Sequence, residues 1–233
     1  VMKSIPMKVT VTCLTDEYSQ SMIKTYKDLQ RVKEQGDYIL DCKELSELEG
    51  GKWKRSRKKI HKSEKELTWR FANYDDYDLL VHFFKQWLQV CKDTMRLSRP
   101  VIGRDIQLLD FIWKNKLLDK NPFFIVLVFY EGELDAIRIT EMSPFKSEWQ
   151  IGVTKKSLRK HGLSSFYAGW ISEDIGYKEG RLYCNTSGGY GDIYNKSGIA
   201  NHKDMFKPIA VHRPYTLKFK KTELTDKEKK LYY

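Results

Sequence analysis

Two β-rich runs near the middle of the chain constrain its fold more than any other feature. Residues 121–130 (NPFFIVLVFY) and 133–142 (ELDAIRITEM) are separated by the dipeptide Glu131-Gly132. Because glycine adopts positive φ at little cost, this dipeptide predicts the turn of a β-hairpin. The first run is also the longest uncharged apolar run, and it falls far short of the roughly 20 residues that a bilayer requires. We therefore expect paired strands here and no membrane span.

Strands and helices both flank this hairpin. Residues 74–93 and 104–118 have apolar side chains at helical spacing, and residues 156–170 pass from a cationic loop into an apolar helix. Further strands are predicted at residues 67–75, 147–153, 181–186 and 215–221, and a short helix at residues 197–206. From residue 67 onward the order is strand, helix, helix, hairpin, strand, helix, strand, helix, strand.

The first 62 residues differ in character from the rest. Residues 7–14 alternate with a period of two and predict a strand, and residues 16–35 have the acidic start and apolar spacing of a helix. We expect three regions: a strand-helix extension with a basic segment, a main domain and a mobile tail, at residues 1–62, 63–220 and 221–233.

Positive charge is in excess along the chain. There are 42 Lys and Arg against 31 Asp and Glu, and the net charge of +11 favours a polyanionic partner. Residues 52–62 hold seven Lys or Arg and no acid, and Trp53 among them offers a stacking surface. The candidates for binding a polyanionic substrate are Lys54, Arg55, Arg57 and Lys58. A solvated helix face is the alternative interpretation of this run.

The cysteines give a prediction about the compartment. Cys13, Cys42, Cys91 and Cys184 are far apart and form no CxxC pair. Reduced thiols in a cytoplasmic protein without a zinc site are the simplest interpretation. No Walker-type lysine motif, HExxH motif or nucleophile elbow is present in the sequence either.

The junction between residues 147–153 and the next helix carries the motif Arg159-Lys-His-Gly162-Leu-Ser164. Together with the element order, it resembles the Q/R-x-x-G-x-G/A signature of the GNAT acyltransferase superfamily. The resemblance implies an α+β, GNAT-like fold with a mixed central sheet flanked by helices and an acyl-CoA donor. Backbone N–H groups at a helix start suit a pyrophosphate. The implied cofactor-binding residues are Arg159, Lys160, His161, Gly162, Leu163, Ser164 and Ser165.

Two features of this motif leave alternatives open. Ser164 stands where the superfamily usually has glycine or alanine. Gly162 could also be a simple helix breaker, with Leu158, Phe166 and Trp170 as ordinary core residues.

A second resemblance covers other parts of the chain. Residues 37–62 and 197–219 are similar to the segments before and at the end of the phosphatidylglycerol lysyltransferase C-terminal domain, in which Lys203, Pro208 and Tyr215 match the closing pattern. That family and the similar FemAB-type enzymes are tandem or paired GNAT-like folds that move aminoacyl groups from charged tRNA. The resemblance implies aminoacyl-tRNA as an alternative donor, Lys203 as a substrate-binding residue and residues 2–49 as a partial first unit, an N-terminal α/β extension.

Acyl transfer to an amine requires a base, an oxyanion donor and an acid for the leaving group. Glu148, on the predicted strand beside the junction, is the first candidate base, and Glu141 on the preceding strand is the alternative. A backbone N–H in the strand WQIGV is the expected oxyanion donor. The resemblance of DIYNKSGI to a GNAT element implies Tyr194 as the acid and Asn185 as its upstream partner.

The glycine-rich segment SGGYGDIYNKSG follows this Asn. Its tyrosines make Tyr190 a candidate for base stacking on a substrate, although an ordinary turn would explain the segment equally well.

These observations predict an acyl- or aminoacyltransferase that moves an acyl group from a CoA thioester or a charged tRNA. The acceptor would be an amine or hydroxyl on a polyanion, for example a modified DNA base, so DNA or tRNA is the expected partner. The alternatives are a small-molecule N-acetyltransferase that uses acetyl-CoA and a non-catalytic nucleic-acid-binding module on the same fold. Anionic lipid is a further candidate polyanion, and the oligomeric state stays open.

Overall fold

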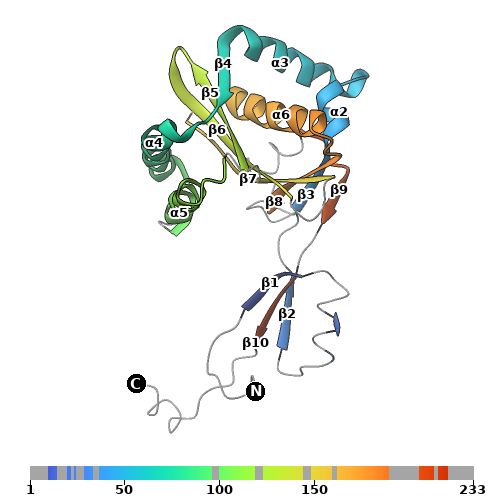
Figure 1. The fold of residues 1–233 in the computed structure, drawn as a ribbon. Helices are drawn as coiled ribbons and strands as arrows, with labels where there is room; N and C mark the ends of the chain where they lie inside the picture. The colour runs from blue at the N-terminus through green and yellow to red at the C-terminus, as the bar shows by residue number, and fades with distance from the viewer. Residues whose placement is uncertain are drawn as a thin grey trace. The chain divides into compact units, whose positions relative to one another are not determined.

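The computed structural model describes residues 10–14, 20–21, 24, 29–33, 37–95, 100–118, 123–143, 148–158, 162–188, 205–212 and 215–219 (Figure 1). The chain divides into two compact units. One unit comprises Val1–Asp37 with His212–Tyr233, and the other comprises Tyr38–Val211.

The smaller unit contains a sheet of three strands in the order β1-β10-β2. Strand β1 is Thr10–Leu14, β2 is Leu29–Lys33 and β10 is Tyr215–Phe219, and β10 pairs antiparallel with both of the others. The helix predicted over residues 16–35 is therefore wrong at Leu29–Lys33. This segment forms its ladder with β10, which lies far away in the sequence, and such long-range pairing overrides a local helical pattern.

The larger unit is built on a sheet of seven strands in the order β4-β5-β6-β7-β8-β3-β9. Strands β4 to β7 pair antiparallel in succession, β7 and β8 pair parallel, and the sheet is therefore mixed. The strand bounds are Asp37–Asp41 (β3), Leu67–Phe71 (β4), Phe123–Tyr130 (β5), Glu133–Met142 (β6), Trp149–Ser157 (β7), Tyr183–Gly188 (β8) and Ala210–His212 (β9).

The predicted hairpin is confirmed as β5 and β6. Its two turn residues, Glu131 and Gly132, have φ of 51° and 84°. Positive φ at both central positions is the geometry whose twist matches that of paired strands. The local pattern thus predicted both the pairing and the turn.

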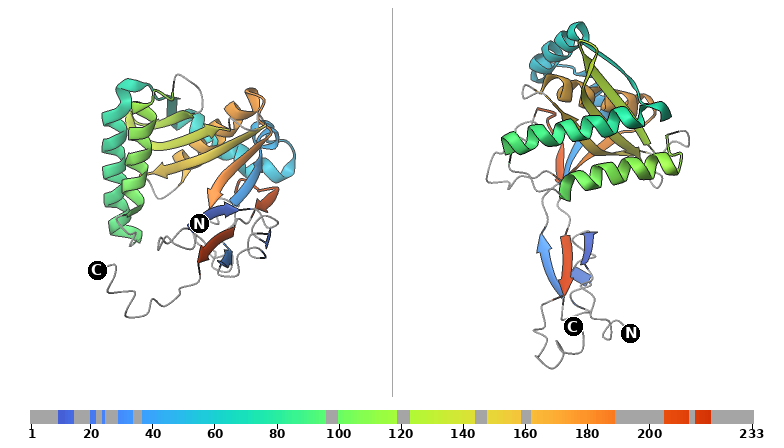
Figure 2. Two further views of the ribbon diagram at one scale, coloured as in Figure 1. Left: turned by 60° about the horizontal axis from the view of Figure 1, so that its bottom comes forward. Right: turned by 90° about the vertical axis from the view of Figure 1, so that its left-hand side faces the viewer.

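Helices cover both faces of this sheet (Figure 2). Helices α4 (Tyr77–Met95) and α5 (Pro100–Lys114) pack on one face, and α6 (Leu163–Lys178) packs on the other, with α2 (Cys42–Glu47) and α3 (Lys54–Glu66) against α6. Short 3-10 turns at Gly51–Trp53 and Tyr74–Asp76 precede α3 and α4. Among the described residues, no helix combines the length and the apolar character needed to cross a membrane.

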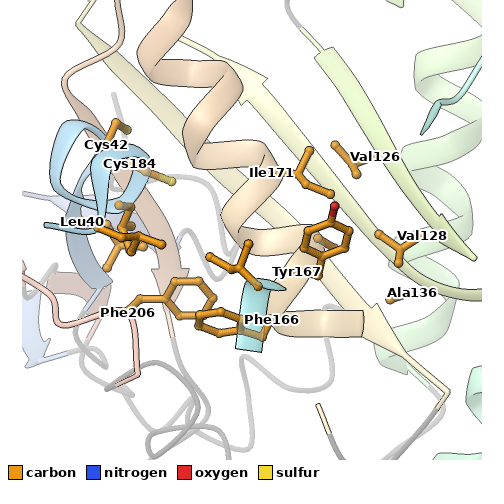
Figure 3. Close-up of a cluster of buried hydrophobic side chains, with 14 of the residues drawn as sticks. Leu40, Cys42, Val126, Val128, Ala136, Phe166, Tyr167, Ile171, Cys184 and Phe206 are labelled. Carbon is orange, nitrogen blue, oxygen red and sulfur yellow. The ribbon is translucent and has the colours of Figure 1, made fainter. Parts of the chain in front are cut away.

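The alternation of side chains along β5 feeds two separate cores. Val126 and Val128 pack in the cluster on the α6 face, and Ile125 and Leu127 pack in the cluster under α4 and α5. In the first cluster, Tyr167 of α6 lies near these valines and Ala136 (Figure 3). Strand β5 is therefore buried on both of its faces, which explains its continuous apolar run in the sequence.

Helices α2 and α3 belong to the larger unit, whereas the sequence placed most of their residues in the N-terminal extension. Trp170 of α6 donates a hydrogen bond from Nε1 to the carbonyl oxygen of Leu45 at 2.9 Å, and Ser46 bonds to Asp174 at 2.5 Å. On α3, Ser56, Ile60 and Ser63 are buried at helical spacing. Because one face of α3 is thus packed, a boundary at residue 62 would cut through a helix of the core.

Candidate active site

Strand β7, helix α6 and strand β8 form a parallel β-α-β unit at the centre of the sheet. In open sheets, ligands bind where such strands end and the connecting helix begins. Helix α6 begins after Gly162, which has φ of 63°, and the amide of Phe166 donates to the carbonyl oxygen of Gly162 at 2.9 Å. The first turn contains no acidic residue and no side-chain cap. Its N–H groups and the helix dipole therefore favour an anion at this point.

The residues implied for the cofactor divide at this helix start. Gly162, Leu163, Ser164 and Ser165 form its cap and first turn, whereas Arg159, Lys160 and His161 lie outside the described residues. Ser164 is buried, and its hydroxyl donates to the carboxylate of Asp135 on β6. The side chain that departs from the GNAT pattern is thus turned toward the sheet.

Asp135 holds both ends of this junction. Its backbone oxygen accepts a hydrogen bond from the amide of Leu158 at 2.9 Å, and its carboxylate accepts from Ser164. No pattern in the sequence pointed to Asp135, since an acid inside a β-rich run carries no signal of a partner 29 positions away.

Strands β7 and β8 separate near the middle of β7. Their pairing covers Trp149–Ile151 and Tyr183–Asn185, whereas β6 stays paired with β7 as far as Ser157. Beyond Ile151, the β8 side of β7 has no strand partner among the described residues. This separation opens the sheet toward the end of β7 that leads to α6.

Strand β7 also carries a bulge at this separation. Ile139 pairs with Thr154 and Thr140 pairs with Gly152, so Val153 is an extra residue in the ladder. A bulge leaves its extra residue outside the regular ladder, and bulges are frequent next to active sites. The bulge lies in the WQIGV strand, where the sequence predicted a backbone N–H donor.

A buried ion pair lies under this part of β7, between the sheet and α6. Arg138 of β6 and Glu173 of α6 have side chains that are 3% and 1% exposed, and Arg138 Nη2 donates to Glu173 Oε1 at 3.1 Å. Gln150 of β7 donates from Nε2 to the other carboxylate oxygen and to the carbonyl oxygen of Ser172 at 3.3 Å. Arg138, Glu173 and Gln150 thus form one buried network that links β6, α6 and β7.

Two glycines make room for this network. A Cβ on Gly152 would lie 1.9 Å from Arg138 Nη2, and a Cβ on Gly176 would lie 2.1 Å from Gln150 Oε1. Arg138 Nε and Gln150 Oε1 have no hydrogen-bond partner among the described residues.

Two buried thiols border the same network. Cys42 Sγ lies 3.7 Å from Glu173 Oε2, and Cys184 Sγ lies 3.7 Å from Arg138 Nη2. Burial, followed by the charge of Glu173, raises the pKa of both thiols. Neither cysteine forms a disulfide, and neither is poised as a nucleophile.

The two candidate bases lie in different places. Glu148 is an exposed turn residue directly before β7, and roughly 30 Å of strand, at about 3.3 Å per residue, separates it from the start of α6. The sequence predicted Glu148 beside the junction, whereas the structure places it at the opposite end of β7. Its backbone oxygen accepts from the amides of Leu182 and Tyr183 at 2.8 and 3.0 Å, which anchors the start of β8.

Glu141 lies at the point where β7 and β8 part. It pairs with Ile151, and Ile151 pairs with Asn185, the last described pair between these strands. Thr140 and Cys184, the preceding residues on β6 and β8, contact the α6 layer, so alternation places Glu141 and Asn185 on the other face. The structure thus brings these two predicted residues into one row.

The remaining predicted residues have mixed outcomes. Lys54, Arg55 and Lys58 are exposed on α3. Arg57 is bonded within the protein: its Nη1 donates to the carbonyl oxygen of Leu48 and, at 2.9 Å, to that of Gly50. Tyr190, Tyr194 and Lys203 lie outside the described residues.

Comparison with known proteins identifies the fold. No protein-family model matches the sequence, and no curated protein matches it significantly. A conserved protein of unknown function from Bacteroides thetaiotaomicron superposes with a TM-score of 0.68 at 14% identity, over 91% of this chain and 70% of that one.

Two further structures are similarly close. The C-terminal domain of a putative lysylphosphatidylglycerol synthetase from Agrobacterium fabrum gives 0.66 at 14% identity, over 91% and 67% of the two chains. L-PGS from Bacillus licheniformis gives 0.64 at 16% identity, over 93% and 69%. The fold is GNAT-like. The predicted α+β class with a mixed, helix-flanked sheet is thus confirmed.

Proposed function

We propose that this chain is an acyltransferase whose donor binds at the start of α6, with its acyl-bearing end in the opening between β7 and β8. One observation carries the proposal: the uncapped helix start and the separation of the strands belong to one β-α-β unit, and the separation extends from the bulge at Val153 toward the end of β7 that leads to this helix. The helix start suits an anionic group of the donor, and the separated strands suit an extended arm because unpaired strand edges offer N–H and C=O groups.

The residues at the helix start fit an acyl-CoA donor. Gly162 and the amides of Leu163 to Ser165 would hold its pyrophosphate. The Ser164 side chain would not obstruct the pyrophosphate, because its hydroxyl is bonded to Asp135 on the sheet. The donor supplies an acyl group activated as a thioester. Aminoacyl-tRNA is the second candidate donor, and its terminal phosphates would meet the same N–H groups.

Glu141 is the better candidate for the base. Glu141 lies where β7 and β8 begin to separate, on the face of the sheet away from α6, and there its carboxylate could take a proton from an acceptor amine. The backbone N–H of Val153, at the bulge, would donate to the oxyanion. Tyr194 stays a prediction for the acid. The exposed cations of α3 support a nucleic acid, as donor carrier or as acceptor, and a small amine with acetyl-CoA is the alternative substrate.

Calorimetric titration with CoA and acetyl-CoA tests the donor site. Replacement of Gly162 by valine should weaken binding at least about tenfold, since it strains a positive φ and places bulk where the phosphate would approach. Gly180→Val is the matched control: Gly180 follows the other end of α6 with φ of 81°, and a Cβ added there would have no atom within 4 Å.

Each outcome of this comparison is informative. Loss of binding in the Gly162 variant alone supports the site. An equal effect of both variants would mean that strain in α6, and not the helix start, governs binding. If wild-type protein binds neither CoA nor acetyl-CoA but binds charged tRNA, the acyl-CoA donor is excluded in favour of the aminoacyl donor. If it binds none of them, the proposed transferase function fails.

A further inference from the structure

Strand β4 lies at one edge of the seven-stranded sheet as the described residues form it, and it exposes two aromatic side chains. Trp69 and Phe71 are 41% and 47% exposed. Their ring centroids lie 5.6 Å apart in a T-shaped arrangement, and Phe71 forms a second such pair with Phe124 at 6.1 Å. Leu67, on the same face of the strand, packs in the core under α3 and α6. The aromatic pair therefore extends the outer surface of that layer.

The same strand borders a hollow of about 290 Å³ lined by Thr68, Trp69, Arg70, Phe129 and Gly132. Arg70 lies over the ring of Phe129 at 5.4 Å from its centroid, and both of its terminal nitrogens bond to Asp76 at 2.6 Å. This bidentate pair holds the guanidinium plane in one orientation and compensates its charge. The edge of the sheet thus offers flat groups on both of its faces.

The helix that leads into β4 carries positive charge that its own acids do not balance. Helix α3, KRSRKKIHKSEKE, has seven Lys or Arg and two Glu, and Glu66 is followed directly by Leu67 of β4. Lys62 is paired with Glu66, whereas Lys54, Arg55 and Lys58 are exposed and have no ion pair among the described residues. From Lys54 to Lys65 the helix rises by about 16 Å, the length of roughly five nucleotides at about 3.4 Å each.

We propose that α3 and β4 form a binding surface for single-stranded nucleic acid, on which phosphates lie along α3 and unpaired bases stack on Trp69 and Phe71. Cations along one element and exposed aromatic rings on the element that directly follows it supply the two components of such surfaces. The net charge of +11 opposes a second copy of the chain as the occupant. An apolar peptide would use the aromatic pair but not the cations. The inference extends the proposed function to its polyanionic partner and does not depend on the donor site.

Fluorescence anisotropy with a labelled 12-nucleotide oligothymidine at several salt concentrations tests this surface. Trp69→Ala and Phe71→Ala should each weaken binding about tenfold and leave the salt dependence unchanged, because stacking releases no counterions. The triple variant Lys54→Gln, Arg55→Gln, Lys58→Gln should flatten the salt dependence by about 0.7 for each lost phosphate contact. Thermal melting checks that each variant is folded.

Phe111 → Ala is the matched control, since Phe111 is 53% exposed on α5, which packs on the other face of the sheet. It should bind like the wild type. Equal binding of oligothymidine to the aromatic variants and the wild type would overturn the proposal. Tighter binding of duplex DNA or of an acidic peptide, with an affinity that the aromatic substitutions do not change, would overturn it as well.

Titration of the same variants with CoA separates this surface from the donor site. CoA affinity should persist in the aromatic variants. If CoA binds normally but oligothymidine does not bind, the nucleic-acid surface fails and the donor site stands. If oligothymidine binds as expected but no donor does, the reverse holds.

Discussion

Replacement of Gly152 by alanine should destabilise the protein far more than a single added methyl group suggests. The new Cβ would lie 1.9 Å from Arg138 Nη2 and 2.4 Å from its Cζ, so the guanidinium would have to move by more than 1 Å. A guanidinium in solvent would do so at little cost. Arg138 is 3% exposed and bonded to Glu173, which is 1% exposed, so its movement leaves a buried carboxylate without its cation. Breaking such a pair costs about 3–5 kcal/mol.

Urea denaturation of the wild type and the variant measures this cost. Gly51→Ala is the control, because no atom lies within 4 Å of its Cβ position, and it should change stability by no more than about 0.5 kcal/mol. In an Arg138→Ala background the clash is absent, so the additional cost of Gly152→Ala should largely disappear. A cost below about 1 kcal/mol in the wild type, or an equal cost in both backgrounds, would refute the reasoning.

Three further predictions concern separate groups. In a turnover assay, Glu141→Gln should lower kcat about 100-fold and leave donor affinity unchanged, because it removes the proposed base. Glu148→Gln should leave kcat near the wild-type value. A large loss of kcat in the Glu148 variant alone would make Glu148 the base instead. The hydrogen bond from Arg70 lowers the pKa of Asp76, so the pair stabilises the fold above the unfolded pKa of about 4 and this contribution is lost as pH falls below it. The stability difference between wild type and Asp76→Asn in urea titrations should therefore shrink toward pH 2, and a constant difference would contradict it. Because burial raises its pKa, the Cys184 thiol should react with a thiol reagent only as the protein unfolds, and rapid labelling of native protein would show that the network opens.

Local patterns predicted those elements whose own residues show a clear helical or strand period. The hairpin of β5 and β6 needed only its two runs and a turn, and α4 and α5 needed only helical spacing. Strand β1 was predicted from its own alternation, although its partner β10 lies at the other end of the chain, whereas β2 was missed because its segment has helical spacing and forms a strand only through its pairing with β10. A single sequence without its pairing partners cannot separate these cases.

The candidate site was predicted in part for the same reason. The helix start after Gly162 follows from the motif, and the structure places it there. The sequence predicted Arg57 as one of four substrate-binding cations, because nothing in the charge run indicates its hydrogen bonds to the carbonyl oxygens of Leu48 and Gly50. The roles of Asp135 and Arg138 depend on Ser164 and Glu173, both far along the chain, and no spacing rule could have paired them.

The strand order of the large sheet has a consequence for how the protein folds. Strands β4 to β7 follow one another in space as they do in sequence, so most of their contacts are local and can form early. Strands β8, β3 and β9 form the other part of the sheet and come from three distant segments. Closing those loops is entropically slow. We expect the β3 segment to stay unpaired until β8 is in place, so β3 and β9, which extend the sheet beyond the opening that we assign to the donor, are added last.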